Sequence, residues 1–234
     1  PAIFKGIRDG GTHIKAQLRN QLEYLTTKSS CIIDSRGTYD GQSVLSVKEI
    51  EQVTSRFSAQ WNEGFHPKLG HTSHLLMAFP IGTRGADVAE ITREICERFF
   101  QGEGSHFDYV AAVHEDRDHP HAHIVLNRRS KDGEFFFLKQ GHHFNYDNFR
   151  EAMVEVSDRY GLRLEATRKV ERGITTTSPN DVEHRGAKAT GKALSERKRV
   201  GPELDRVLAE VAQNARLYRG LAAEATRENQ LDIA

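Results

Sequence analysis

This 234-residue sequence has no long hydrophobic run, only two cysteines and no excess of charge of one sign. No apolar stretch approaches the ~20 residues that a membrane-spanning helix needs, so we expect no membrane segment. The two cysteines, Cys31 and Cys96, lack metal-ligand spacing, which favours reduced thiols over a disulfide framework. Lys and Arg number 33 together, and Asp and Glu also number 33. Any basic surface for a nucleic acid must therefore be local.

Histidine, in contrast, is concentrated in one short stretch that starts at His114 and reads His-Glu-Asp-Arg-Asp-His-Pro-His-Ala-His-Ile-Val-Leu. The apolar run at its end is short and β-branched, which indicates a strand. Alternate side chains on a strand share one face, so His121 and His123 would point the same way. The segment 107–114 is also strand-like, and Pro120 lets the chain turn between the two segments. We therefore expect His114 to lie beside the other two histidines.

Three imidazoles from two neighbouring strands would form a metal site with open coordination positions, which is the catalytic rather than the structural pattern. Histidine-rich turns also occur without metal, but the third histidine, the acidic turn and the strand context favour a ligand set. Asp116 and Asp118 lie in that turn and could orient an imidazole or accept a proton. His119 precedes the proline, which favours a DNA contact or a turn residue over a fourth ligand. Three nitrogen ligands favour Mn, Ni or Zn over Mg.

The periodicity of the remaining chain predicts an α+β fold with an antiparallel-rich sheet. Strands are predicted at 2–7, 74–79, 107–114 and 121–128, with 135–139 as a hairpin partner of the last. Helices are predicted at 13–28, 46–64, 88–102 and 145–161, and a loop or hairpin at 29–45. Residues 163–199 carry ten Lys/Arg against five Asp/Glu, which indicates an extended, solvated arm before a last helix that starts at Pro202.

The first predicted helix carries a tyrosine away from its apolar face. Its apolar stripe is formed by Ile14, Leu18, Leu22 and Leu25. Tyr24 falls about 120° from the centre of that stripe. A tyrosine inside the stripe would belong to the core, whereas one this far from it lies at the edge or is exposed, where its hydroxyl can act. An ordinary tyrosine on a helix flank would give the same pattern, so this segment alone favours no chemistry.

Three segments, taken in order, resemble the conjugative relaxases of the HUH endonuclease superfamily. They are Gln21-Leu22-Glu23-Tyr24-Leu25, the strand from His74 to Pro80, and His114-x-Asp116-x-x-His119-Pro120-His121-x-His123. The chain is similar in particular to the T-DNA border relaxases (VirD-type) of plant-tumour-inducing plasmids, which have runs like its Gln-Leu-Glu-Tyr-Leu, Asp-Arg-Asp-His-Pro-His and Glu-Arg-Gly-Ile-Thr. The second segment departs from that family, whose motif ends Ser-Phe-Pro, because Ala78 has no hydroxyl. Whether Thr72 or Ser73 supplies one instead is open.

The resemblance implies a fold and a division of the chain. It implies an HUH-type antiparallel sheet of about five strands, flanked by helices, in a nuclease domain at residues 1–175. Residues 176–234 would form a basic arm and a C-terminal helix. The chain would then be the N-terminal nuclease part of a longer protein.

The implied activity is site- and strand-specific nicking and rejoining of single-stranded DNA by transesterification, which initiates conjugative or T-DNA transfer. Tyr24 would be the nucleophile and would leave a 5′-phosphotyrosyl link and a 3′-hydroxyl. His114, His121 and His123 would hold one divalent metal, Mg or Mn in activity, with Zn or Ni possible. Asp116 and Asp118 would assist in catalysis. A phenol has a reference pKa of about 10, so it needs a base or nearby cations to attack at neutral pH.

The resemblance also implies partners. These are single-stranded DNA at a transfer origin or border nick site, an accessory relaxosome protein and a type IV secretion coupling protein. The protein would act in the bacterial cytoplasm and be exported with its covalently bound DNA into a recipient cell. The residues expected to contact DNA are His74, His119, Asn127, Arg128, Arg129 and Arg172. For the arginines, solvated surface charge is an equally simple explanation, and the basic arm could either follow single-stranded DNA or be a linker.

Three other functions fit parts of the pattern. A rolling-circle replication initiator or transposase of the same superfamily would place its tyrosine after the histidines, at Tyr146 or Tyr160. A three-histidine zinc hydrolase would use metal-bound hydroxide and form no protein–DNA adduct. A non-enzymatic DNA-binding module would cut nothing. Replacement of Tyr24 by Phe, with an assay for a denaturant-resistant adduct, separates these cases.

Overall fold

The computed structural model describes residues 1–102, 106–177, 179 and 181–227. They divide into two compact units, 1–166 and 167–234. The first unit contains one sheet, formed by β1 (Ile3–Gly6), β2 (Cys31–Asp34), β3 (Thr72–Ala78), β4 (Tyr109–His114) and β5 (His121–Asn127). The five strands lie in the order β1-β3-β5-β4-β2, and every neighbouring pair is antiparallel. The predicted α+β fold with a five-stranded antiparallel sheet is confirmed.

The position predicted for the fifth strand was wrong. Residues 135–139 are not a strand, and only a single bridge joins Phe135 to Arg129. The fifth strand is instead β2, inside the segment predicted as a loop or hairpin. It has 4 residues and pairs with β4 at the edge of the sheet. So short a run has too few positions to show a period of two, which is why the pattern did not reveal it.

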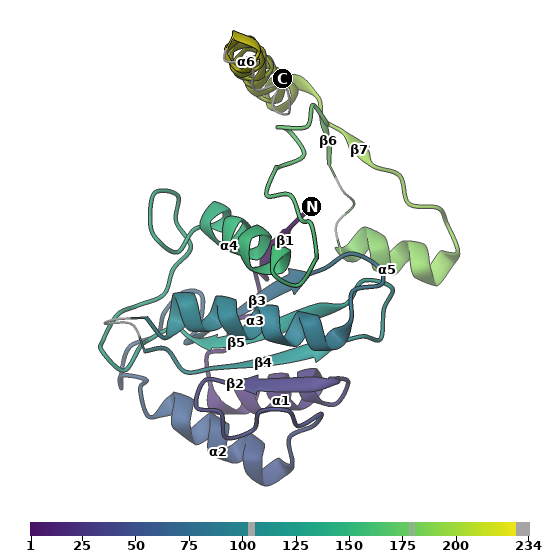
Figure 1. Ribbon diagram of the computed structural model, residues 1–234. Coiled ribbons are helices and arrows are strands. Elements are labelled where there is room, and N and C mark those ends of the chain that lie inside the picture. Colours follow the sequence, from purple (N-terminus) through teal and green to yellow (C-terminus); the bar gives the residue numbers. More distant parts are fainter. Residues whose placement is uncertain (103–105, 178, 180, 228–234) are drawn as a thin grey trace. The chain divides into compact units, whose positions relative to one another are not determined.

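Helices cover both faces of the sheet (Figure 1). Two of them, α1 (Lys15–Thr26) and α2 (Val47–Ser58), pack on one face, and α3 (Gly85–Phe100) and α4 (Tyr146–Asp158) pack on the other. A complete capping box at Ser46 and Glu49 starts α2, as predicted. This helix ends at Ser58 and not at Gly64, so Trp61 lies beyond it and donates its indole N–H to Asn127 at 2.9 Å.

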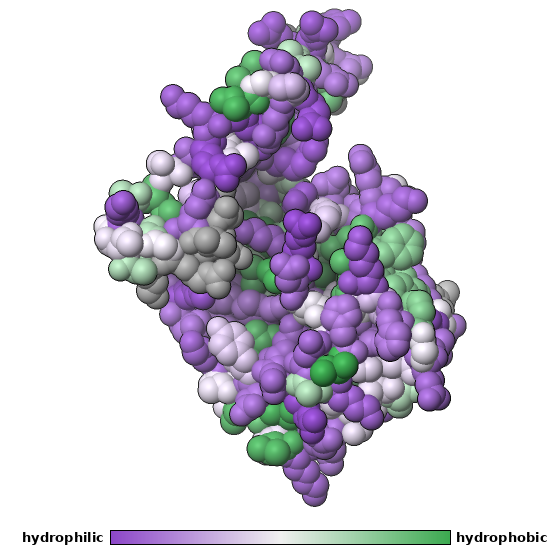
Figure 2. Space-filling view, turned by 180° about the vertical axis from the view of Figure 1, so that it is seen from behind, coloured by the Kyte–Doolittle hydropathy of each residue, from purple (hydrophilic) through white to green (hydrophobic). Residues whose placement is uncertain are grey.

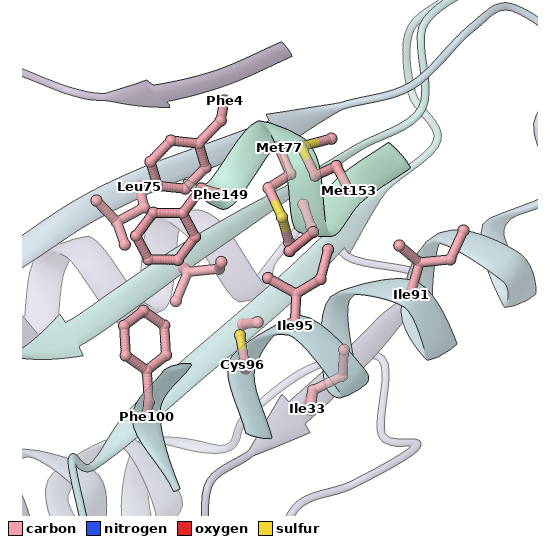
Figure 3. Close-up of a cluster of buried hydrophobic side chains, with 14 of the residues drawn as sticks. Phe4, Ile33, Leu75, Met77, Ile91, Ile95, Cys96, Phe100, Phe149 and Met153 are labelled. Atoms are coloured by element: carbon pink, nitrogen blue, oxygen red, sulfur yellow. The ribbon is translucent and has the colours of Figure 1, made fainter. Parts of the chain in front are cut away.

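The larger apolar core lies between the sheet and the helices α3 and α4. Figure 3 shows Phe100 and Cys96 of α3 near Phe149 of α4 and Leu75 of β3. The strand β5 supplies this core with Ala122, Ile124 and Leu126. The alternation predicted from the sequence is therefore confirmed, because these three residues share one face and leave the histidines on the other.

The smaller core lies under α1 and α2, on the face that carries the histidines. Leu18, Leu22 and Leu25 of α1 pack there against Val125 of β5. Ile14 was expected in the same stripe, but it precedes the helix and is exposed. The helix thus buries three leucines over the middle of the sheet, and the ends of β4 and β5 that carry the histidines lie beside this core.

A buried ionic network ties α2 to the far end of the same strands. Asp108, which is fully buried, accepts from the Arg36 guanidinium at 3.0 and 3.1 Å and from the Gln60 amide. Arg56 of α2 donates to Asp34 and also approaches Asp108 at 3.6 Å. Two buried carboxylates therefore share cations from the β2–α2 segment, which anchors α2 to the sheet.

The second unit was only partly predicted. The segment expected to be an extended arm contains α5 (Asp181–Thr190) and a two-stranded sheet of β6 (Thr176–Thr177) and β7 (Arg197–Lys198). Several of its cations are paired within the unit, for example Lys169 with Glu196 at 2.7 Å. The long helix α6 (Gly201–Arg227) follows, close to the predicted start. A basic composition alone therefore did not make this segment extended.

The surface seen in Figure 2 is mostly hydrophilic, with hydrophobic side chains in small separate groups. Within the described residues, no helix combines the length and the apolar character that crossing a bilayer would require.

We expect Asp108→Ala to lower the free energy of unfolding by about 1–3 kcal/mol, because it removes the fully buried carboxylate that accepts from Arg36 and Gln60 and leaves those donors without this partner. The matched control is Glu51→Ala, which breaks the exposed pair with Arg19 and should cost less than about 1 kcal/mol. Urea denaturation of both variants measures the difference. Equal losses would show that the buried network does not anchor α2.

Candidate active site

The three histidines of the predicted metal site come together at one end of the central strands. His114 ends β4 and His121 begins β5, and the two are direct partners in the antiparallel register. His123 follows two residues later on the same face. The three ring centres lie 4.9–5.2 Å apart. One ring nitrogen from each residue can be chosen so that all three lie within 4.8 Å of one another.

Burial favours the neutral form of His121 and His123. It lowers the pKa of His123 to about 2, and the neighbouring rings of His74 and His114 lower it further. Burial also lowers the pKa of His121. A neutral imidazole has a lone pair on one nitrogen, which is the form that binds a metal ion. The pocket therefore holds His121 and His123 in the ligating state at neutral pH.

Backbone carbonyl groups fix which nitrogen is free in two of the rings. His121 donates its Nδ1–H to the carbonyl oxygen of His119 at 3.0 Å. His114 donates its Nε2–H to the carbonyl oxygen of Leu25 at 2.7 Å. A carbonyl oxygen can only accept, so the lone pair lies on Nε2 of His121 and on Nδ1 of His114.

The third ring is oriented by another histidine. Nδ1 of His123 lies 2.8 Å from Nε2 of His74, and one proton is shared between them. His123 can present Nε2 as a ligand only when its own Nδ1 carries that proton and His74 accepts it. Burial lowers the pKa of His74 to about 4, which keeps this ring neutral and able to accept. The structure therefore places His74, predicted to contact DNA, against a candidate metal ligand.

A glycine and a glutamine hold His74 in place. A Cβ atom at Gly10 would lie 2.5 Å from the Cβ of His74, so only glycine lets this loop pack so closely. The amide of Gln21 on α1 donates to the carbonyl oxygen of Gly10 at 2.8 Å. The motif Gln21–Leu25 thus supports the histidine motif at 114–123 through the loop that covers His74.

These residues fit a divalent metal ion. Nδ1 of His114 and Nε2 of His121 and His123 would hold it, and three neutral nitrogens would leave its double charge uncancelled. Such a donor set suits Mn, Zn or Ni better than Mg.

Tyr24 lies on α1 and is 65% exposed, as its angle from the apolar stripe predicted. The next residue, Leu25, supplies the carbonyl group that accepts from His114. The segment of α1 that carries Tyr24 is therefore in direct contact with the histidine cluster. The ammonium group of Lys28 lies 5.9 Å from the centre of the Tyr24 ring.

The acidic turn between β4 and β5 is exposed. Asp116 lies close enough to His121 to oppose the effect of burial on the pKa of that histidine. His119 donates Nδ1–H to the carbonyl oxygen of Phe79 at 3.1 Å, and its own carbonyl orients His121. His119 is therefore a turn residue that supports a ligand. Asp118 is exposed in the same turn.

The residues predicted to contact DNA lie in different environments. Asn127 is fully buried, and its amide group accepts from Trp61 and donates to the carbonyl oxygen of Phe57, so in this structure it presents no exposed surface. Arg128 is buried, and Arg129 is half-buried against the Phe65 and Phe135 rings. Arg172 is exposed and belongs to the second unit.

The open question about a hydroxyl group is partly answered. Ala78 is the direct cross-strand partner of His121, so a serine here would place its hydroxyl beside a ligand. The hydroxyl of Thr72 lies 2.7 Å from that of Thr12 and ties down the loop before α1. Ser73 points to the face opposite His74, since successive residues of β3 alternate. Neither residue replaces the missing hydroxyl at position 78.

Comparisons with known proteins agree with this geometry. A family model described as relaxase, MobA/VirD2-like, nuclease domain, matches residues 26–162. This range holds all three histidines and begins two residues after Tyr24. Three relatives named T-DNA border endonuclease VirD2 are similar to the chain.

The relative from Rhizobium radiobacter is 33% identical over 192 residues, which are 78% of this chain and 45% of the relative. That from Agrobacterium fabrum is 34% identical over 184 residues, 74% of this chain and 41% of the relative. That from Rhizobium rhizogenes is 33% identical over 183 residues, 74% of this chain and 42% of the relative. The chain thus spans less than half the length of these relatives.

We expect His121→Ala and His123→Ala each to weaken binding of Mn²⁺ or Zn²⁺ at least tenfold, because each removes one of three ligands. Titration calorimetry measures the affinity. The matched control is His106→Ala, which removes an exposed histidine paired with Asp132 and should leave the affinity unchanged. Wild-type affinity in the ligand variants would place the ion elsewhere.

We expect His74→Gln to retain metal binding and His74→Leu to lose about 10- to 100-fold in affinity, because only Gln offers an oxygen that accepts from Nδ1 of His123. The absorption spectrum of bound Co²⁺ reports on the ligand geometry without any activity assay. The two variants have similar size, so equal losses would mean that His74 acts only by packing.

Proposed function

The chain belongs to the MobA/VirD2-like relaxase family, and we propose that it nicks and rejoins one strand of DNA by transesterification at a transfer origin or T-DNA border. Tyr24 is the proposed nucleophile, and His114, His121 and His123 are the proposed ligands of one divalent metal ion. Asp116 and Asp118 are the proposed acceptors of the tyrosine proton or partners of an imidazole.

One observation supports this proposal above the others. The hydrogen bond from His114 to the Leu25 carbonyl group joins the histidine cluster to the residue next to Tyr24. If α1 packed elsewhere on the sheet, Tyr24 would lie too far from the three histidines to act with them. An exposed tyrosine on a helix that is attached to three convergent imidazoles is the arrangement that the reaction needs.

The chemistry transfers one phosphodiester bond. The hydroxyl oxygen of Tyr24 bonds to the phosphorus, the bond from phosphorus to the 3′-oxygen breaks, and the phenol proton passes to a carboxylate or to water. The departing 3′-oxygen takes up a proton and becomes a hydroxyl group. A divalent ion, when bound, would polarise the non-bridging oxygens of the scissile phosphate. No bond energy is lost to water, so the reverse step rejoins the strand.

Three other tyrosines of the first unit, Tyr39, Tyr109 and Tyr160, are less suited to attack. Tyr39 and Tyr109 are buried. The hydroxyl of Tyr160 donates to Glu94, which raises the pKa of Tyr160 to about 12. Tyr160 also packs with the core on the opposite face of the sheet from the histidines. This disfavours the rolling-circle arrangement in which Tyr160 would attack.

We extend the proposal to partners and location. The DNA is single-stranded at the nick, an accessory relaxosome protein helps to expose it, and a type IV secretion coupling protein receives the product. The protein acts in the bacterial cytoplasm and leaves with the DNA attached. Pull-down with the coupling protein, and detection of the chain in recipient cells, would test each part separately.

We expect Tyr24→Phe to abolish cleavage and adduct formation while metal and DNA binding remain, because the change removes only the hydroxyl. The assay incubates the protein with end-labelled single-stranded oligonucleotides that cover T-DNA border and transfer-origin sequences, with Mn²⁺ or Mg²⁺. Denaturing gels then detect a covalent adduct. The matched control is Tyr218→Phe, which changes an exposed tyrosine of α6 and should behave as the wild type.

Each rival function has its own outcome. Cleavage without any adduct in the wild type supports a hydrolase that uses metal-bound hydroxide. Loss of the adduct in Tyr146→Phe or Tyr160→Phe, with Tyr24→Phe active, supports the rolling-circle arrangement. Binding of DNA without cleavage under every condition supports a non-enzymatic module.

A further inference from the structure

A cavity of about 410 Å³ opens at the edge of the sheet, and His74 connects it to the histidine cluster. β1 pairs only with residues Leu75 to Ala78 of β3, so residues 72–74 have no strand partner on that side. The cavity lies at this gap. His74 forms part of its wall and also contacts His123, so an occupant of the cavity would be one side chain away from the proposed metal ligands.

The cavity carries positive charge and no negative charge of its own. Arg128 and Arg8 line it, and none of the described residues that line it is Asp or Glu. Arg128 is 5% exposed, and no carboxylate within the described part of the chain pairs with it. The other two cavities described in the first unit include carboxylates in their walls. This cavity alone of the three therefore favours an anion.

Arg128 is a cation whose burial is uncompensated. Its Nε and Nη2 atoms donate to the carbonyl oxygen of Phe136 at 3.1 and 3.0 Å, and its guanidinium lies 4.8 Å from the centre of the Phe135 ring. Burial lowers its pKa. Burying a charge without a counter-ion is costly, so a bound anion beside Arg128 would offset that cost. A phosphate group offers the anion that a guanidinium binds best.

Aromatic rings form the other wall. Phe136, Phe137 and Tyr146 line the cavity, and Phe137 and Tyr146 are 39% and 40% exposed. Partly exposed rings next to cations are the combination on which a nucleobase stacks while its phosphate is neutralised. The cavity volume lies within the range of small-ligand sites, about 300–1,000 Å³.

We propose that this cavity holds one nucleotide of the single-stranded DNA, a neighbour of the nucleotide at the metal site. Its base stacks against Phe137 and Tyr146, and its phosphate meets Arg128 and Arg8. The inference rests on the proposed function for its choice of DNA as the ligand. Ser73, which also lines the cavity, is placed to donate to the phosphate or base. The cavity would thus select the register in which the strand enters the active site.

The test measures DNA binding without metal ion, so no cleavage takes place. The probe is a single-stranded oligonucleotide with a T-DNA border or transfer-origin sequence, chosen as the one that the wild type binds most tightly. A series of versions carries an abasic site at each position in turn. The variants are Phe137→Ala and Arg8→Gln, both at exposed positions. Their controls are Val47→Ala on α2 and Arg98→Gln on α3.

We expect one abasic position to weaken binding to the wild type by about 5- to 100-fold. The same abasic site should cause no further loss of affinity in Phe137→Ala. Either change alone already removes the stacking contact between this base and the Phe137 ring. Arg8→Gln should lower the slope of log affinity against log salt by about 0.7, the value for one phosphate of a single strand. Both controls should match the wild type.

Additive effects of Phe137→Ala and every abasic site would overturn the proposal, as would controls that weaken binding equally. Arg8→Gln could weaken the salt dependence while the effects of Phe137→Ala and the abasic sites remain additive. That result would mean that Arg8 contributes surface charge only, and it would also overturn the proposal. Arg128→Met is a third variant, and since it can fail to fold, the two exposed variants decide the result. The wild type could form no adduct while Phe137→Ala and one abasic site still have non-additive effects on binding. That result would refute the proposed function but support the nucleotide site in the cavity.

Discussion

The register between β4 and β5 is the constraint on which the site depends. The pairing of His114 with His121 sets two imidazoles side by side and places His123 between β3 and β4 on the same face. A slip of one residue would turn every side chain of β5 to the opposite face and bury the histidines in the core under α3. Ala122, Ile124 and Leu126 resist such a slip, because it would expose them. The apolar core on one face therefore maintains the polar site on the other.

Hydrogen bonds orient the three imidazoles so that each can present one nitrogen to a metal ion. Each of the three rings uses one nitrogen for an internal partner, which leaves the other nitrogen free. Two partners are backbone carbonyl groups, whose positions depend on the turn before β5 and on the end of α1. The third is His74, which depends on a glycine that permits close packing. The site is thus held by α1, β3 and the acidic turn together, and removal of any one of them would free a ring to rotate.

The sequence predicted what depends on local periodicity and missed what depends on neighbours across the sheet. Alternation along β5 identified the histidine face, and the helical period identified Tyr24 as exposed. The contact between His74 and His123 could not be predicted, because it joins residues 49 positions apart through a strand register that no local pattern gives. The burial of Asn127 was missed for the same reason: a polar residue at a strand end looks exposed until its contacts with Trp61 and Phe57 are known. β2 was too short to show a period.

Polar groups without a compensating charge in the described residues lie at both ends of the central strands. At one end, the imidazoles of His114, His121 and His123 are crowded together. At the other end, Asp34 and Asp108 are buried with arginine partners, but Arg128, next to Asn127, is buried without a carboxylate partner in the described residues. Crowded imidazoles and an unpaired buried cation both cost free energy in the protein alone. A bound metal ion would compensate the first and a bound phosphate the second, so each ligand should stabilise the end of the sheet at which it binds. The cavity that both His74 and Arg128 line lies between these two features along the edge of the sheet.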